Sequence, residues 1–221
     1  MEHVARTIRS RPVHISPHHL PGALNIPDDA FGLIVFAHGS GSSRSSPRNV
    51  AVAQALDRAG MATLLFDLLH PGEEAEHHRA KVFDISLLAD RLVQAVAWVD
   101  RHDDLKPLPL GLFGASTGAA AALVAAAALG PRVGAVVSRG GRPDLAGDAL
   151  LEVKAPTLLI VGGDDVGVLD LNVQAYERLP YPKMLEIVPG ATHLFPEPGA
   201  MERVTLLAKS WFEHHLKRGP L

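Results

Sequence analysis

The pentapeptide Gly114-Ala115-Ser116-Thr117-Gly118 decides how the rest of this sequence is interpreted. An apolar run, Leu110–Phe113, precedes it, and an alanine-rich stretch, Ser116–Leu129, follows it. A G-x-S-x-G segment between a strand and a helix is typical of a sharp turn that holds the serine hydroxyl above a sheet, at the positive end of the helix. Ser116 is therefore a candidate nucleophile. The alternative is a helix-capping serine in a glycine-rich turn.

Short apolar runs and longer helical patterns alternate on both sides of that turn. The predicted strands are Leu33–Ala37, Ala62–Phe66, Leu110–Phe113, Val133–Val137, Thr157–Val161 and Met184–Val188. The predicted helices are Pro47–Ala59, Asp84–Arg101, Ser116–Leu129, Leu171–Leu179 and Gly199–Leu216. This order predicts an α/β fold with a mostly parallel central sheet and helices on both faces. The first thirty residues are expected to add one or two antiparallel edge strands.

The length of 221 residues fits a single domain spanning residues 1–221. The segment from Arg139 to Pro156 is too short to form a separate cap domain over the serine. We therefore expect an open, shallow site.

A base and an acid for Ser116 are predicted further along the chain. A serine on such a turn is followed in chain order by the acid and then the histidine of a triad. Three histidines follow Ser116, and only His193 lies in a loop after a predicted strand; the other two lie near the end of the last helix. The preceding strand runs into Asp164 and Asp165. Successive side chains seldom point the same way, so one of these carboxylates is expected to orient His193, and the pattern leaves both open.

The segment His38-Gly39-Ser40-Gly41 directly follows the strand Leu33–Ala37 and matches a loop that supplies a backbone N–H to an oxyanion. The expected oxyanion hole combines the N–H of Thr117 with that of Ser40, with Gly41 as the alternative. A phosphate-binding nest is the competing interpretation of this Gly/Ser loop. Neither a Walker lysine nor a G-x-G-x-x-G segment is present, so nucleotide binding is not favoured.

Arginines lie in the loops at the same predicted sheet edge. Arg48, Arg139 and Arg142 are the candidate substrate-binding residues, and Arg44 lies close by in sequence. Guanidinium groups near the serine would select an anionic substrate. The alternative is structural ion pairing with loop acids such as Asp67 or Asp144.

Composition excludes several other functions. The net charge of −3 gives no sign of the excess positive charge that nucleic-acid binding uses. The absence of cysteine excludes disulfides and thiolate chemistry. The apolar run Ala119–Leu129 is too short to span a bilayer, and the N-terminus lacks a signal-like apolar run, so we expect a cytoplasmic protein without membrane contact. The segment Glu73–His78 invites a metal-site hypothesis, but a solvated polar loop is favoured. No metal or cofactor is expected.

The sequence resembles the α/β-hydrolase superfamily and, within it, the dienelactone hydrolase-like group. More narrowly, it is similar to the hydrolase domain that some bacteria fuse to a phosphoribosyltransferase. The segments that carry this likeness are Phe36–Ser43, Ser46–Asn49, Phe66–Leu69 and Ser138–Pro143. The resemblance implies Ser116, Asp165 and His193 as the triad, since the acid of this family commonly stands three residues after a glycine such as Gly162. Dienelactone hydrolases proper use a cysteine nucleophile, whereas this chain carries serine.

These observations predict a serine hydrolase that cleaves an ester or a lactone through an acyl-enzyme on Ser116. The expected partner is a small-molecule ester or lactone, with an anionic one favoured if the arginines act as suggested. Acyl transfer to another acceptor, such as an alcohol or peroxide, is one alternative. A non-catalytic hydrolase-like binding module is the other, because a fold alone does not prove activity. The oligomeric state is left open.

Overall fold

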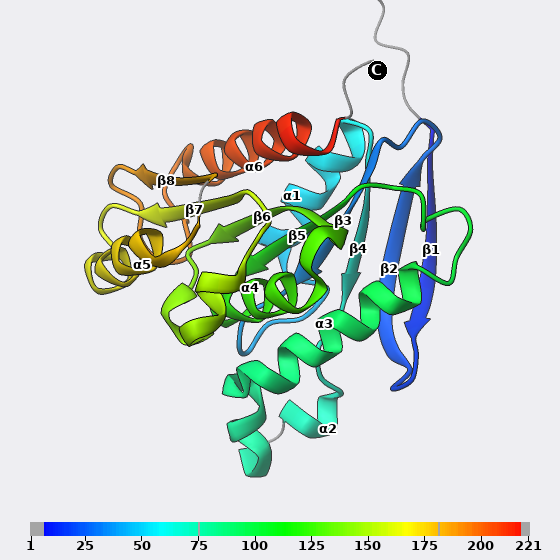
Figure 1. Cartoon of the computed structure of the whole chain (residues 1–221), viewed down its shortest axis with the longest axis horizontal. Coiled ribbons are helices and arrows are strands. Elements are labelled where there is room, and N and C mark those ends of the chain that lie inside the picture. The colour runs from blue at the N-terminus through cyan, green and yellow to red at the C-terminus, as the bar shows by residue number, and fades with distance from the viewer. Residues whose placement is uncertain (1–6, 75, 181, 218–221) are drawn as a thin grey trace, which may run out of the picture.

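Eight strands form one sheet in the order β1-β2-β4-β3-β5-β6-β7-β8 (Figure 1). The computed structural model describes residues 7–74, 76–180 and 182–217. The strands are β1 (Ile8–Ile15), β2 (Leu20–Pro27), β3 (Gly32–Ala37), β4 (Met61–Phe66), β5 (Leu110–Ala115), β6 (Val133–Arg139), β7 (Thr157–Gly162) and β8 (Lys183–Val188). The α-helices are α1 (Pro47–Arg58), α2 (Pro71–Glu74), α3 (Ile85–Val99), α4 (Thr117–Leu129), α5 (Val166–Arg178) and α6 (Ala200–Leu216), and the 3₁₀ segments are η1 (Glu76–Phe83), η2 (Gly130–Arg132) and η3 (Pro143–Glu152).

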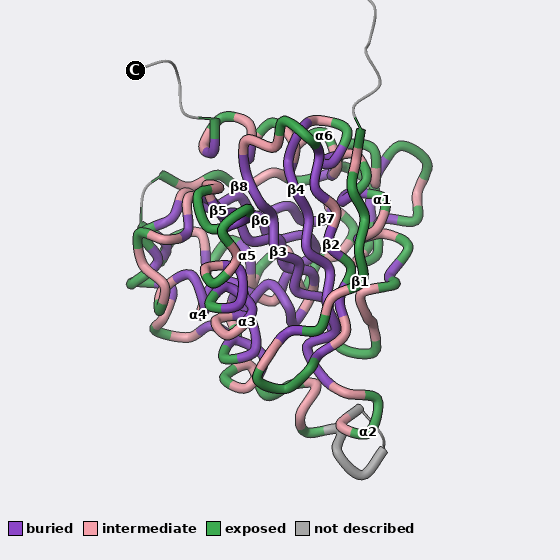
Figure 2. Tube along the Cα trace, turned by 90° about the vertical axis from the view of Figure 1, so that its right-hand side faces the viewer, coloured by how far each residue is buried: buried purple, intermediate pink, exposed green. Residues whose placement is uncertain are grey.

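The pairing within the sheet confirms the predicted α/β fold. Strands β3 to β8 pair in parallel, and β1 and β2 pair antiparallel at one edge, where β2 also pairs antiparallel with β4. The first thirty residues therefore supply two antiparallel strands. The outermost strand, β1, is largely exposed, whereas the central strands are buried (Figure 2). A parallel strand that is covered on both faces has a continuous apolar sequence, which is why the central strands were recognisable.

Two apolar clusters lie on the two faces of the sheet. Helices α1 and α6 pack on one face, where Leu56 and Phe212 meet Phe113 of β5. Helices α3, α4 and α5 pack on the other, where Leu92 and Leu123 belong to a second cluster. Both faces are therefore closed, and the loops at the carboxyl ends of the strands are left as the place for a site.

Helix α5 begins at Val166, five residues before the predicted start at Leu171. Its first turn faces solvent, with Val166 65% exposed, so no apolar periodicity marks it. The 3₁₀ segments η1 and η3 were not predicted either. Segment η3 packs against α4 and α5, and no cap domain forms between β6 and β7. The prediction of a fold without a cap is confirmed.

None of the helices in the described part of the chain is both long and apolar enough to cross a bilayer. The same residues contain no group of three or more histidine or acidic side chains arranged to hold a metal ion. The histidines of the Glu73–His78 segment are not covered by that statement, because the side chains of residues 74–79 lie outside the described part.

Candidate active site

Ser116 lies in the sharp turn between β5 and α4. Its backbone has φ 52° and ψ −123°, a conformation that side-chain-bearing residues rarely adopt. The two glycines of the pentapeptide allow this turn to be tight. A Cβ at Gly114 would lie 2.4 Å from Cα of Ala119, and a Cβ at Gly118 would lie 2.3 Å from the carbonyl oxygen of Ala37. The turn is therefore wedged between its own helix and the end of β3.

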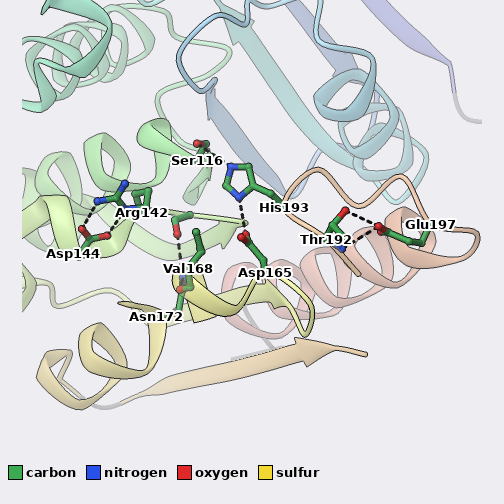
Figure 3. A network of polar contacts seen from close by, with 10 residues as sticks. Ser116, Arg142, Asp144, Asp165, Val168, Asn172, Thr192, His193 and Glu197 are labelled. Carbon is green, nitrogen blue, oxygen red and sulfur yellow. Dashed lines mark hydrogen bonds and ion pairs between the residues drawn. The ribbon is translucent and has the colours of Figure 1, made fainter. Parts of the chain in front are cut away.

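Three side chains form a chain of polar contacts at this turn (Figure 3). Oγ of Ser116 lies 3.3 Å from Nε2 of His193. Nδ1 of His193 lies 2.7 Å from Oδ2 of Asp165. With the proton on Nδ1, the imidazole donates to the carboxylate, and Nε2 is free to accept the serine proton. The arrangement can deprotonate the hydroxyl and hold the resulting imidazolium next to a negative charge.

The two candidate acids differ in where their side chains lie. Asp165 ends the loop after β7 and is the residue that precedes α5, with its side chain 16% exposed. Asp164 is exposed, and its backbone N–H donates to the carbonyl of Ala191 at 3.0 Å. Of the two, only Asp165 is bonded to His193 among the described residues.

The loop after β3 reaches the serine turn through Ser40. Its N–H donates to Oγ1 of Thr117 at 2.9 Å. The N–H of Thr117, as the first residue of α4, has no acceptor inside the helix. His38 anchors this loop: it is buried, and its Nε2 accepts a hydrogen bond from the N–H of Leu68 at 3.0 Å. Both expected oxyanion-hole residues therefore lie together, with the Ser40 N–H already engaged by a hydroxyl.

The loops beside Ser116 are held by residues that the sequence did not single out. Buried Asn172 on α5 donates to the carbonyls of Gly141 and Val168, at 3.0 and 2.8 Å (Figure 3). Gly141 lies next to Arg142, whose N–H donates to the carbonyl of Ser116 at 3.1 Å. A buried asparagine in the middle of a helix is disfavoured unless its amide is bonded, and that isolated polar residue was the only available signal.

Glu197 stabilises the loop that carries His193. One of its carboxylate oxygens accepts from both the N–H and the hydroxyl of Thr192, at 3.1 and 2.5 Å (Figure 3). The hydrogen bond from the Thr192 hydroxyl lowers the pKa of Glu197 below its usual value. The carboxylate is therefore ionised near neutral pH and fixes the residue that directly precedes His193.

The arginines at this edge fall into two groups. Arg142 donates to both oxygens of Asp144, at 2.8 and 2.7 Å, and Arg44 pairs with Asp67. For Arg142 the structure therefore shows the structural ion pair that was the alternative to substrate binding, because a bidentate carboxylate neutralises its charge. Arg139 is buried and donates to Oδ1 of Asn49 at 3.0 Å. Arg48 precedes Asn49 in α1 and is half-buried.

The strand order, the helices on both faces and a serine on the turn after β5 are those of an α/β-hydrolase. No family model matches the chain. A crystal structure of dienelactone hydrolase from Anabaena variabilis ATCC 29413 is 53% identical, with 96% of this chain and 100% of that chain covered and a TM-score of 0.90. Est1E from Butyrivibrio proteoclasticus with bound ferulic acid has the same fold at 17% identity, with 94% and 100% of the two chains covered and a TM-score of 0.79.

A "Putative phosphoribosyl transferase" of Mycobacterium tuberculosis (strain H37Rv) is 58% identical over 200 residues. The match covers 90% of this chain but 45% of that protein, so the chain spans about half of its length. Together with the likeness to the Anabaena structure, this shows the family. The chain belongs to the dienelactone hydrolase-like group of α/β-hydrolases.

Proposed function

We propose that this chain is a serine hydrolase domain that cleaves an ester or a lactone through an acyl-enzyme on Ser116. The observation that carries the proposal is the continuous contact from Oγ of Ser116 through His193 to Asp165. The family supports hydrolysis as the class of reaction. A binding module would have no need for a serine held in an unfavourable backbone conformation beside a histidine and a carboxylate.

In the proposed reaction, Oγ of Ser116 attacks the carbonyl carbon while its proton moves to Nε2 of His193. The carbonyl π electrons move to the oxygen, and the N–H of Thr117 donates to this oxyanion. The oxyanion then re-forms the carbonyl, the bond to the leaving alkoxy oxygen breaks, and His193 returns its proton to that oxygen. Water then attacks the acyl carbon while its proton moves to His193. The bond to Oγ of Ser116 breaks, His193 returns the proton to that oxygen, and the acid is released. In a lactone the two products remain joined as one hydroxy acid.

The second oxyanion donor is proposed to be the N–H of Ser40. In the resting structure this N–H donates to Oγ1 of Thr117, so it is held at the serine turn before substrate arrives. A substrate oxygen that enters beside Thr117 can share this donor. Groups that are already positioned stabilise a developing charge without having to reorganise during the reaction.

The test is to substitute Ser116→Ala and to expose the wild type to a fluorophosphonate probe, which reacts only with an activated serine. We expect the probe to label Ser116 and the variant to retain less than about one hundredth of the wild-type rate on short-chain aryl esters, because the covalent step needs the hydroxyl. Ser210→Ala, on the exposed face of α6, is the matched control and should keep full activity. Retained turnover in Ser116→Ala, or labelling of another serine, would reject the assignment.

A further inference from the structure

Two arginines, Arg48 and Arg139, come together near the start of α1, and neither pairs with a carboxylate among the described residues. Arg139, the last residue of β6, is 5% exposed, and its Nε has no hydrogen-bond partner. Its Nη2 donates to Asn49, and Arg48 is the residue before that asparagine. Nε of Arg48 is also buried without a partner. Neither arginine forms an ion pair within the described part of the chain, in contrast to Arg44 and Arg142.

This arrangement is energetically unfavourable as it stands. Burial, and to a smaller extent the like charge of Arg48, lower the pKa of Arg139 to about 10. Buried charges in proteins are normally paired or bonded at every donor, because transfer of an unpaired ion out of water is costly. A bound anion would supply the missing charge and the missing acceptors.

Arg48 lines an open cleft of about 960 Å³ that provides donors for such an anion. Five serines between residues 40 and 46 line the same cleft, and Val82 and Phe83 form an apolar wall. No acidic residue lines it among those described. Helix α1 begins at this cleft. Ser46 makes no side-chain cap, so the N–H groups in the first turn of α1 are not satisfied by a capping side chain. Ser40 lines this cleft, and its N–H donates to Oγ1 of Thr117, the residue that directly follows the candidate nucleophile.

Arg48 also borders a second cleft, on which acidic residues lie. Glu197 and Glu202 line this smaller cleft of about 300 Å³. Repulsion from these carboxylates would direct an anion toward the serine-lined side.

We propose that the serine-lined cleft is a subsite for a phosphate group on the substrate, held by Arg48 at the start of α1 with the Arg139 guanidinium behind it. The proposal rests on the proposed hydrolase function and names the class of its substrate: a carboxylic ester or lactone that carries a phosphate monoester. A phosphate monoester has a charge of about −1.5 to −2 and three terminal oxygens. It can balance two guanidinium groups and accept from several hydroxyl and N–H donors, whereas a carboxylate has one charge and two oxygens.

Binding is tested without turnover, by calorimetry of the wild-type protein with phenyl phosphate and, in parallel, with benzoate. We expect phenyl phosphate to bind at least about tenfold more tightly than benzoate, since it can form more charge-assisted hydrogen bonds. Arg48→Gln should weaken phenyl phosphate binding by about tenfold or more. Arg101→Gln removes the same charge at an exposed position at the end of α3 and should leave binding unchanged. Equal binding of the two anions, or equal binding by wild type and Arg48→Gln, would overturn the proposal.

Selectivity is tested with two aryl acetates, one with a phosphate on the ring and one with a methoxy group in its place. In the wild type and in Arg101→Gln we expect kcat/KM for the phosphorylated ester to exceed that for the neutral ester by about tenfold or more, and in Arg48→Gln we expect the ratio to approach one. If both esters are cleaved at the same kcat/KM, the subsite is refuted while the hydrolase function stands. If phenyl phosphate binds through Arg48 but neither ester is cleaved and the fluorophosphonate probe fails to label Ser116, the hydrolase function fails and the anion site stands.

Discussion

Ser116 combines an unfavourable backbone conformation with a hydroxyl that contacts His193. A non-glycine residue at this φ is strained by about 1–3 kcal/mol, and such strain persists only where the surrounding structure enforces it. Here the enforcement comes from close packing: Gly118 lies directly against the carbonyls of Ala37 and His38. The result is a hydroxyl that projects toward His193 instead of capping its own helix, and Ser116 makes no side-chain cap.

Asp165→Asn tests the acid that the geometry selects. The amide keeps the size of the side chain but carries no negative charge to stabilise the imidazolium, and it disfavours the tautomer of His193 that accepts the serine proton. We expect kcat on a short-chain aryl ester to fall by about 10⁴, by analogy with the same change in a serine protease. Asp164→Asn is the matched control and should alter kcat little, because Asp164 is exposed. The opposite ranking of the two variants would transfer the acid role to Asp164.

Thr117→Val tests whether the hydroxyl of Thr117 positions the Ser40 N–H. Valine keeps the shape of the side chain but cannot accept the 2.9 Å hydrogen bond. We expect kcat to fall by about 10- to 100-fold with KM little changed, because a donor to the transition state would be misplaced. Thr117→Ser retains the hydroxyl and should restore most of kcat. Equal kcat values for Thr117→Val and the wild type would show that this hydrogen bond has no part in the reaction.

Helix α1 is joined to the sheet by a buried acid at its end. Oδ1 of Asp57 accepts from the hydroxyl of Thr63 on β4, at 2.7 Å, and Oδ2 accepts from Nδ2 of Asn25 on β2, at 2.9 Å. Desolvation by burial outweighs these hydrogen bonds and raises the pKa of Asp57 to about 6. The contact ties α1, β2 and β4 together on the face that α1 and α6 cover.

This raised pKa gives the free energy of unfolding a pH dependence of known sign. Between the unfolded pKa near 4 and the folded pKa of about 6, the folded state binds more protons than the unfolded state. Asp57 therefore makes its full contribution to the free energy of unfolding at low pH. That contribution, about 2–3 kcal/mol, is lost as pH rises through this window.

The measurement is urea unfolding of wild type and Asp57→Asn at a series of pH values from 4.5 to 7.5. We expect the wild type to lose stability relative to the variant as pH rises, because asparagine does not titrate. Asp103→Asn, at an exposed position, should follow the wild-type curve. Parallel curves for wild type and Asp57→Asn would show that Asp57 has the same pKa in both states.

At the scale of the whole molecule, the sheet places residues that are far apart in sequence at one edge. Ser116, Asp165 and His193 follow β5, β7 and β8, and the loop after β3 approaches the same edge from the other side of β5. No cap domain forms between β6 and β7, and the cleft lined by Arg48 is open. An open cleft can admit a polar, charged substrate directly from water.

The sequence by itself determined the alternation of strands and helices, the turn that carries Ser116 and the loop that carries His193. Those features are local: continuous apolar runs mark strands covered on both faces, and the glycines of the pentapeptide are demanded by backbone contacts within a few ångströms. The start of α5 was missed because its first turn is exposed and has no apolar pattern.

Only the tertiary structure decided which polar side chains meet. Asp164 and Asp165 are indistinguishable as neighbours in sequence, and the direction of each depends on how the loop enters α5. Likewise, Arg142 is neutralised by Asp144, whereas Arg139 of β6 and Arg48 of α1 come together across 91 residues of sequence, and neither forms an ion pair with a described acid. The pairing of charges depends on distances of a few ångströms between loops, and hydrophobic patterning carries no information about those distances.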